Sequence, residues 1–482
     1  MTTPFFPALR PRLAPMGRRV QSVRQQSLTH LERLFASFFP PELLAQADEG
    51  PNSRQRIYTV RRVFWGFLYQ VLNPKSSCRT VVDQIRALLC LHELESTEGG
   101  TAGYCTARAR FPLERFQRIR QAVTAHTQKQ LPLDQASWHG LTLKVIDGTT
   151  VSLSDTPENQ LAYPQPRSQK PGCGFPLLKL VAVFSLATGA LLDYAKGNKR
   201  HSEQALLQKL LDGLKPSDLA IADRGFCSYA LLALLGLRSV AALFRLNAAK
   251  SADLRQGKWL GAGDRLFTWR KPSEKPCYLP CRLWQRLPKE LSVRVLRVSL
   301  FRPGYRTKSV TLVTTLLDPQ LFRAQELAEL YVRRWRVELW FRDIKTRMGM
   351  EVLRCQTPKM IHKELEMFLI AYNLIRALMA QASAQEQGPL ERLSFKGTVD
   401  AMREYSIAIA QAPSQRLQRK LIADLLKVIA RDQVPDRPGR REPRALKRRP
   451  KTYALLNKHR RQFREIPHRS RYRKNNRRNI GA

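Results

Sequence analysis

The chain has 482 residues, of which 43% are hydrophobic, and its formal net charge is +44. The length indicates about two to four domains with packed cores, and no apolar run approaches the roughly 20 residues of a membrane-spanning helix. A charge this positive requires a polyanionic partner, either nucleic acid or an anionic membrane surface, and the absence of a spanning segment favours nucleic acid.

Residues 1–25 are rich in Pro and Arg and lack the compact apolar segment of a signal peptide, so we expect a flexible basic N-terminus and a cytoplasmic, chromosome-associated protein. From 26 to 135, apolar residues such as Leu28, Leu31 and Leu34 recur at helical spacing, and Arg residues occupy the polar faces. This region is predicted to be a helical DNA-binding domain. For any single Arg, a solvated face is the competing interpretation.

The pattern changes to alternating strands and helices at Leu141, which predicts an α/β domain over 140–376. The expected segments, in chain order, are strands at 141–147, at 177–186 and at 190–194, a helix at 202–214, a strand at 219–223 and a helix at 229–237. Residues from about 243 to 318 are β-rich and interrupt this rhythm, so they are interpreted as an inserted subdomain.

A long helix is expected from about 322 to 347, followed by helices at 362–381 and 397–429. The predicted helical C-terminal region therefore spans 377–433. The remaining residues, 434–482, are crowded with Arg and Lys and are interpreted as a flexible basic tail. The eight Cys residues are scattered without the paired spacing of a zinc site and are expected to be reduced thiols.

Two aspartates end apolar strands, where a carboxylate is rigidly aimed and accessible to a metal ion: Asp147 and Asp223. Taken singly, each is also compatible with an ordinary turn, and Asp147 is followed by Gly. Three nearby aspartates are rivals. Asp155 and Asp218 do not end a clear apolar strand, and Asp193 is not followed by a helix as Asp223 is.

The long helix carries polar residues at offsets that place them on one stripe, within an arc of roughly 60°. They are Tyr331, Arg334, Glu338, Arg342 and Lys345. A buried stripe would not hold so many charges, whereas a surface that binds phosphates would. A solvated helix face is the alternative interpretation.

The spacing Tyr331-x2-Arg334-x3-Glu338-x6-Lys345 resembles the Tyr-Arg-Glu-Lys signature of the insertion-sequence-four family of bacterial DDE transposases. Asp-Gly-Thr-Thr at 147–150 and Ala-Asp-Arg-Gly-Phe-Cys at 222–227 resemble the family's other two motifs, so the resemblance spans roughly 141–374. It implies an RNase H-like α/β core with a β-rich insertion. The N-terminal helical domain and the C-terminal helices with a basic tail, predicted above from the residue pattern, would flank this core.

The resemblance implies that Asp147, Asp223 and Glu338 are the catalytic triad. Carboxylate oxygens suit hard cations, so two Mg²⁺ or Mn²⁺ ions are expected, about 3.5–4 Å apart. Tyr331, Arg334, Arg342 and Lys345 are the expected DNA-binding residues. The implied function is cut-and-paste transposition of an insertion sequence through a hairpin end, with binding to terminal inverted repeats and target DNA by a homodimer and no membrane partner.

Two alternatives remain at this point: another nuclease with the same fold, and a DNA- or RNA-binding protein without catalytic activity. The resemblance also raises a flipped-base role for a Trp in the β-rich segment, since stacking offsets the cost of unpairing a base. Trp259, Trp269 and Trp284 are available, and each is interpreted as a core residue.

Overall fold

The computed structural model describes residues 30–46, 57–74, 76–91, 100–131, 137–167, 169–170, 172–246, 254–300, 309–435 and 462. The predictions for residues 1–25, and for nearly all of the basic tail after 434, lie outside these residues.

A mixed β-sheet forms the centre of the molecule, with strand order β4-β3-β2-β5-β6-β10-β9-β8-β7. These strands are β2 (Leu141–Leu153), β3 (Leu177–Ser185), β4 (Leu191–Gly197), β5 (Asp218–Ala222), β6 (Ala241–Arg245), β7 (Lys258–Gly261), β8 (Asp264–Arg270), β9 (Glu290–Ser299) and β10 (Ser309–Thr314). β2, β5 and β6 are mutually parallel, and the other pairs are antiparallel. Two short strands, β1 (Ser137–Trp138) and β11 (Val352–Leu353), also pair with β2.

Successive residues of a strand point to opposite faces of a sheet, and this alternation creates two cores. In β2, Val145 belongs to the core that contains α14 (Pro358–Gln385), whereas Ile146 belongs to the core under α9 (Glu203–Gln208) and α10 (Tyr229–Gly236). β5 repeats the pattern with larger residues toward α14 and alanines toward α10. Odd-numbered residues of β2 therefore face α14 and even-numbered ones face α9.

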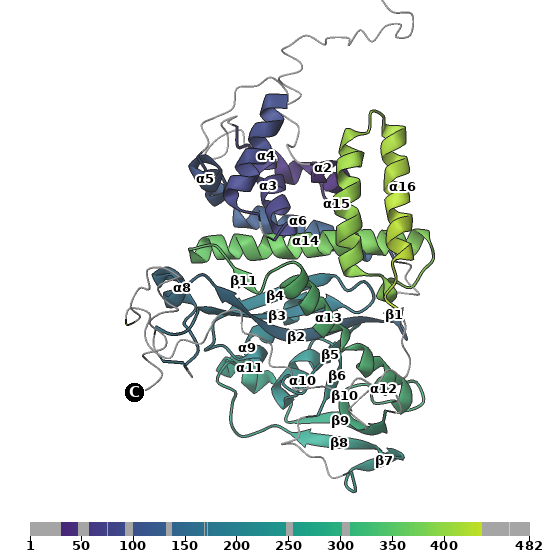
Figure 1. Cartoon of the computed structure of the whole chain (residues 1–482). Helices are drawn as coiled ribbons and strands as arrows, with labels where there is room; N and C mark the ends of the chain where they lie inside the picture. The colour runs from purple at the N-terminus through teal and green to yellow at the C-terminus, as the bar shows by residue number, and fades with distance from the viewer. Residues whose placement is uncertain are drawn as a thin grey trace, which may run out of the picture.

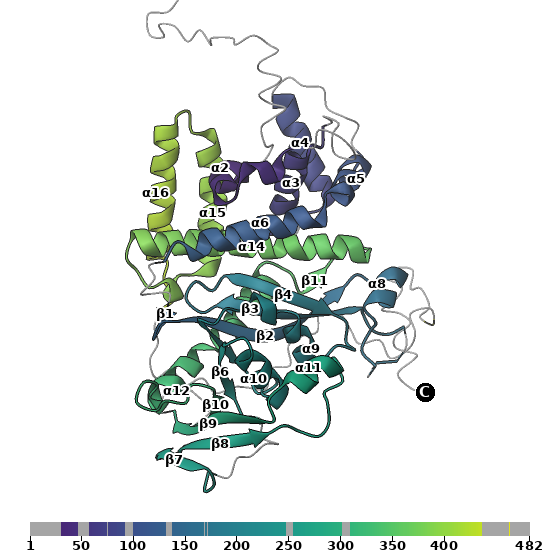
Figure 2. The same cartoon turned by 180° about the vertical axis from the view of Figure 1, so that it is seen from behind.

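The helix α14 lies between the sheet and the N-terminal helices (Figure 1). It passes the length and hydropathy criteria for a membrane span, but 89% of its apolar window is buried within the protein, as in the core helix of a globular domain. Its neighbour α6 lies alongside it (Figure 2). The N-terminal helices are α2 (Leu31–Phe35), α3 (Val60–Leu72), α4 (Cys78–Leu91), α5 (Ala102–Arg110) and α6 (Leu113–Gln128).

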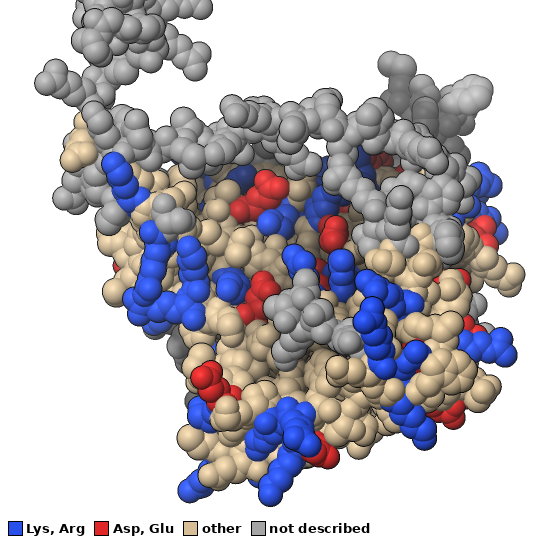
Figure 3. Space-filling model, turned by 90° about the horizontal axis from the view of Figure 1, so that it is seen from below, with Lys and Arg blue, Asp and Glu red and all other residues tan. Residues whose placement is uncertain are grey.

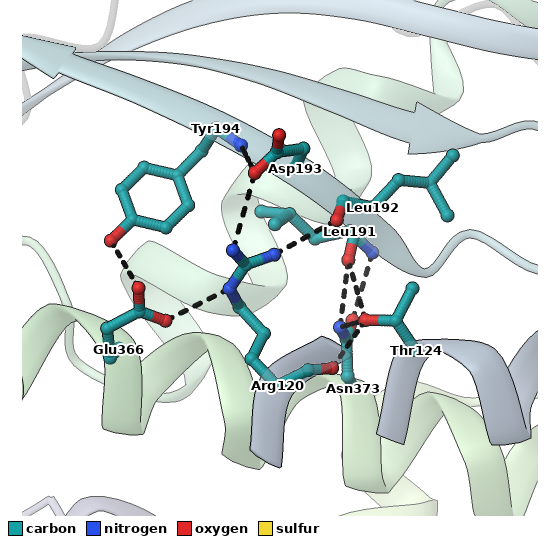
Figure 4. Close-up of polar contacts among 8 residues, drawn as sticks. All are labelled: Arg120, Thr124, Leu191, Leu192, Asp193, Tyr194, Glu366 and Asn373. Atoms are coloured by element: carbon teal, nitrogen blue, oxygen red, sulfur yellow. Dashed lines mark hydrogen bonds and ion pairs between the residues drawn. The ribbon is translucent and has the colours of Figure 1, made fainter. Parts of the chain in front are cut away.

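A buried polar network joins α6, α14 and β4 (Figure 4). The Arg120 guanidinium donates to Glu366 Oε2 at 3.0 Å, to Asp193 Oδ1 at 3.3 Å and to the Leu192 carbonyl at 2.9 Å. Asn373 on α14 adds bonds to both the backbone N–H and the carbonyl of Leu191. The N-terminal helices and the sheet are therefore tied to one another through α14.

Several boundaries differ from the sequence-based expectations. The β-rich segment does not form a separate layer, because β10 pairs with β6 and continues the central sheet. The expected boundary at 376/377 falls inside α14, which serves both regions. The helix expected over 397–429 is two antiparallel helices, α15 (Phe395–Gln411) and α16 (Gln415–Arg431), separated at Pro413 because proline disrupts a continuous helix.

Candidate active site

Asp147 lies within β2, not at its end, because the strand continues to Leu153. The prediction of a strand terminus was wrong, and so was the alternative that Asp147-Gly148 forms a turn. What does end here is the parallel pairing of β2 with β5, whose last register pair is Ile146 and Ala222. Beyond it β2 pairs only with β3 and, near its end, with β11. Asp147 is thus the first residue past the parallel ladder.

Asp223 follows β5 directly, as the sequence predicted. Its Oδ1 accepts the backbone N–H of Gly225 at 2.8 Å, which fixes the side chain in the loop before α10. Since β2 and β5 are parallel neighbours, this places the two aspartates at the same end of adjacent strands. Ligand sites of α/β sheets commonly lie at the carboxyl ends of the parallel strands.

The helix expected over 322–347 is broken into α12 (Ala324–Arg333), α13 (Arg336–Arg342) and a π-helical turn, η5 (Asp343–Arg347). Around Arg334 the backbone N–H groups bond to carbonyls three residues earlier, as in a 3₁₀ helix. Neither Pro nor Gly occupies this junction, so the apolar spacing gave no sign of the break.

Arg334 joins the first and third predicted catalytic residues. Its Nη1 lies 3.2 Å from Asp147 Oδ2 and its Nη2 lies 3.6 Å from Glu338 Oε1. The guanidinium is 7% exposed, whereas the Glu338 side chain is 66% exposed. The fold therefore brings Asp147 and Glu338, 191 positions apart in the chain, to opposite sides of one arginine.

Burial and neighbouring charges shift the ionisation of this site. Burial raises the pKa of Asp147 to about 6; the Gly148 N–H and Arg334 oppose the rise, whereas Asp223 and Glu203 add to it. Burial likewise raises the pKa of Tyr331 to about 12, with Arg334 opposing and Asp223 adding to the shift. Asp147 is thus held close to two other carboxylates, and Tyr331 remains a neutral hydroxyl.

The predicted polar stripe is not one continuous surface, because the helix break rotates its parts relative to one another. Tyr331 and Arg334 are buried, while Glu338 and Arg342 are exposed. Lys345 in η5 points back to β2, with Nζ 3.3 Å from Thr149 Oγ1. Thr149 is on the same face of β2 as Asp147, so Lys345 borders the site. The interpretation of all five residues as an open phosphate-binding face was wrong.

The donor chemistry fits divalent cations that prefer oxygen, because the three predicted ligands, Asp147, Asp223 and Glu338, are all carboxylates. Arg334 lies between Asp147 and Glu338, and among the described residues no three Asp, Glu, His or Cys side chains form a ready-made ion site. Gly148 leaves space that a Cβ would fill, next to the carboxylate of Glu203. The sequence predicted the helix that begins at Ser202 but did not single out Glu203, because a glutamate in a first helical turn is ordinary.

The rival aspartates have structural partners. Asp218 is buried and lies 3.6 Å from Lys144 Nζ, Asp193 pairs with Arg120, and Asp155 accepts from Gln160. The Trp residues differ from one another: Trp284 is partly buried under Lys271, 4.8 Å from its ring, whereas Trp259 is 67% exposed. The interpretation of Trp259 as a core residue was wrong.

Lys and Arg side chains cluster on the face viewed in Figure 3, and fewer Asp and Glu lie among them. The chain contains 83 Lys and Arg but 39 Asp and Glu. Positive clusters of this kind attract phosphates and release their counterions. Against this background, the half-buried carboxylates Asp147, Asp223 and Glu203 form a local exception.

Residues 138–374 match the family described as "Transposase DDE domain". The chain is 27% identical to transposase InsG for insertion sequence element IS4 of Escherichia coli (strain K12), over 89% of this chain and 95% of that protein. It is 31% identical to a probable transposase for insertion sequence element IS5377 of Geobacillus stearothermophilus, over 52% of this chain and 61% of that one. A piggyBac transposase synaptic complex with hairpin DNA superposes with a TM-score of 0.40 at 11% identity, covering 87% of this chain and 85% of that chain. Residues 138–374 thus match a transposase DDE domain, and the chain is similar along most of its length to transposases of insertion sequence elements.

Proposed function

We propose that this protein moves an insertion sequence by cut and paste, cleaving DNA at the terminal inverted repeats and joining the freed ends to target DNA. Asp147, Asp223 and Glu338 are the proposed catalytic triad. The observation that carries this assignment is Arg334, which links Asp147 on β2 to Glu338 on α13 beside the strand end that bears Asp223.

The proposed core is RNase H-like. Its support is the strand arrangement, in which three antiparallel strands, β4, β3 and β2, are followed by the parallel strands β5 and β6. The two aspartates lie where β2 and β5 separate. The segment that returns with Glu338 packs on the α14 face of the sheet, through Val337 and Trp340.

The triad would hold two Mg²⁺ or Mn²⁺ ions, whose oxygen-rich ligand requirement matches three carboxylates. Two such cations, when bound, activate the attacking oxygen and stabilise the leaving oxygen of an in-line displacement. The protein's own part is to fix these carboxylates: the Gly148 N–H donates to Asp147 Oδ1 at 2.8 Å, and Arg334 holds Oδ2. Arg334 is buried against the triad, so we assign it to positioning the carboxylates.

Lys345 is the proposed phosphate contact beside the cut, since its ammonium borders the site at Thr149. Arg342 is exposed one turn earlier and would extend this contact along the DNA. Tyr331, which the sequence analysis placed against DNA, instead packs under Arg334, 5.7 Å from ring centroid to guanidinium carbon. Its proposed role is to support Arg334.

The proposed chemistry exchanges one phosphodiester bond for another, so no energy cofactor is required. Water cleaves one strand and frees a 3′-OH; that 3′-OH attacks the opposite strand and closes a hairpin end, and water reopens the hairpin before the end joins target DNA. Two ends must be cut together, which supports a homodimer on DNA. Residues 26–135 are the proposed DNA-binding domain. The proposed location of the protein is the cytoplasm, on chromosomal DNA.

The test is cleavage of a labelled duplex carrying the DNA that flanks this gene, with Mg²⁺ or with EDTA. Glu338→Gln should lower the cleavage rate by at least about 10²-fold, the size expected when a preorganised electrostatic contact is lost, and should leave DNA binding intact. The matched control is Glu329→Gln, another exposed glutamate on the preceding helix, α12.

Each alternative gives a different result in the same assay. A pre-cut end with a free 3′-OH should be joined to plasmid DNA; hydrolysis without joining would assign the protein to the plain nucleases. Binding without cleavage by folded wild-type protein would assign it to the DNA-binding proteins without catalytic activity. In that case Glu338→Gln would change nothing.

A further inference from the structure

Glu203, the first residue of α9, has an unusual environment for a carboxylate in so basic a chain. Its side chain is half-buried, and within the described part of the chain no side chain or backbone group forms a hydrogen bond or an ion pair with it. Ser202 caps α9 by accepting from the Ala205 N–H, so Glu203 is not needed as the cap. A half-buried charge without a counter-charge is unfavourable unless a ligand supplies one.

The absence of a side chain at Gly148 makes room for this carboxylate. A Cβ at position 148 would lie 2.5 Å from Glu203 Oε1 and 2.8 Å from its Cδ, closer than real Cβ contacts allow. Gly148 is an even-numbered residue of β2, so it faces α9, whereas Asp147 faces α13. The parallel pairing of β2 with β5 ends at Ile146, so Asp147 and Gly148 lie where β2 is no longer paired with β5.

Glu203 also approaches Asp223. A single point, the Cβ direction of Gly225, lies 3.1 Å from Asp223 Oδ1 and 3.8 Å from Glu203 Oε2. The next residue of α9, Gln204, donates from Nε2 to the Gly225 carbonyl at 2.8 Å and so ties the start of this helix to the loop that bears Asp223. After burial, Asp223 and Glu203 are the two carboxylates that raise the pKa of Asp147.

We propose that Glu203 is a fourth carboxylate of the metal site, which would share a divalent cation with Asp147 and Asp223. It reaches the site from the α9 side of β2, opposite to Glu338 on α13, so the two aspartates lie between two glutamates. Hard cations take six or more oxygen ligands, and a fourth carboxylate adds a donor and a negative charge where the site is otherwise short of both. This inference rests on the proposed function.

The test measures cation binding by the full-length protein without DNA, using Mn²⁺ as the probe and electron paramagnetic resonance of the unbound ion as the readout. Glu203→Gln keeps the side-chain shape and removes the charge. It should weaken Mn²⁺ binding by about tenfold or more, at least as much as the loss of an outer-shell contact. Glu203→Asp should recover part of the affinity, and Asp223→Asn should lose more than either.

Glu158→Gln is the matched control. Glu158 is exposed in the first turn of α8 (Pro157–Ala162), a six-residue helix with a hydroxyl cap like α9, and should leave Mn²⁺ affinity unchanged. Thermal melting in EDTA checks that each variant folds. Unchanged affinity in Glu203→Gln together with lost affinity in Asp223→Asn would overturn this inference alone. Unchanged affinity in both would overturn the proposed metal site itself.

Discussion

Two buried arginines of this protein each lie between two carboxylates, but they differ in how fully their hydrogen bonds are satisfied. The buried Arg120 pairs with Glu366, which is fully buried, and with Asp193, whose side chain is half-exposed. Arg334 is as deeply buried, but one of its partners, Glu338, is largely exposed. Arg334 Nε has no hydrogen-bond partner, whereas Arg120 donates from all three of its nitrogens.

This difference indicates that the Arg120 network stabilises the fold, whereas the Arg334 cluster retains unsatisfied hydrogen-bonding groups that a ligand could use. In the network of Figure 4, Tyr194 Oη donates to Glu366 Oε1 and Arg120 donates to Oε2, so both oxygens of the buried Glu366 carboxylate are paired and neither donor can move without leaving one unpaired. Around Arg334, the carboxylates have fewer donors than they can accept. Incomplete satisfaction combined with a raised pKa is typical of functional sites.

Glu366→Gln should produce the largest loss of stability. It removes a charge that faces the buried Arg120, and breaking a buried pair costs about 3–5 kcal/mol. The measurement is the urea midpoint, with the slope, at neutral pH. Asp212→Asn is the control: its pair with Arg238 is exposed, and losing it should cost less than about 1 kcal/mol. Equal losses in the two variants would show that the buried Arg120–Glu366 pair stabilises the fold no more than an exposed pair does.

Arg334→Met should affect catalysis more than folding. It leaves Asp147 without its cationic partner, and cleavage at saturating DNA should fall by about 10²–10³-fold, as when one preorganised donor is removed. The urea midpoint should fall less than in Glu366→Gln, because Glu338 is exposed and can be hydrated. Arg334→Lys keeps the charge without the planar fork and should recover little. Full activity in Arg334→Met would remove Arg334 from the site.

The sequence identified Asp223 and the strand-helix order after it because each depends on local pattern: an apolar run, an Asp, and Ser228 capping α10. It placed Asp147 on the correct strand but wrongly predicted that the strand ends there. What ends before Asp147 is the pairing of β2 with β5, and β2 itself continues to Leu153. The end of this pairing depends on a partner strand whose paired residues lie 76 positions later in the chain, and it leaves no mark near Asp147.

The helix break at Arg334 was missed for a related reason. The residues around it include neither Pro nor Gly, and the break accompanies a contact that is distant in sequence, between the buried Arg334 and Asp147. Glu203 was missed because a glutamate in a first helical turn is ordinary. Only the packing of α9 against Gly148 makes it exceptional. Local elements were thus predictable, and contacts between elements were not.

A hydrogen bond between two neutral side chains, Tyr163 and His362 on α14, makes the stability of the fold depend on pH. His362 lies one turn before Glu366, and Tyr163 Oη is 2.7 Å from its Nε2. Burial, with a smaller effect of Lys196, lowers the pKa of His362 from 6.5 to about 4. As the pH falls, His362 is protonated in the unfolded chain before it is protonated in the folded protein. The stability that neutral His362 contributes is therefore present above pH 6.5 and is lost as the pH falls toward 4. His362→Gln should reduce the fall in urea midpoint between about pH 7 and about pH 5. An unchanged fall would assign the acid sensitivity elsewhere.

Lys345→Gln should have the smallest effect, and it tests whether the open side of the Arg334 cluster meets DNA. Its ammonium borders the site at Thr149 and has no carboxylate within ion-pair distance among the described residues. A single phosphate contact should weaken binding to all sequences alike and lower the salt dependence of binding by about one unit of slope. The control is Lys396→Gln on α15, whose ammonium already pairs with Asp400. An unchanged salt slope in Lys345→Gln, with lost cleavage, would show that Lys345 acts on the carboxylates as Arg334 does and does not contact the DNA backbone.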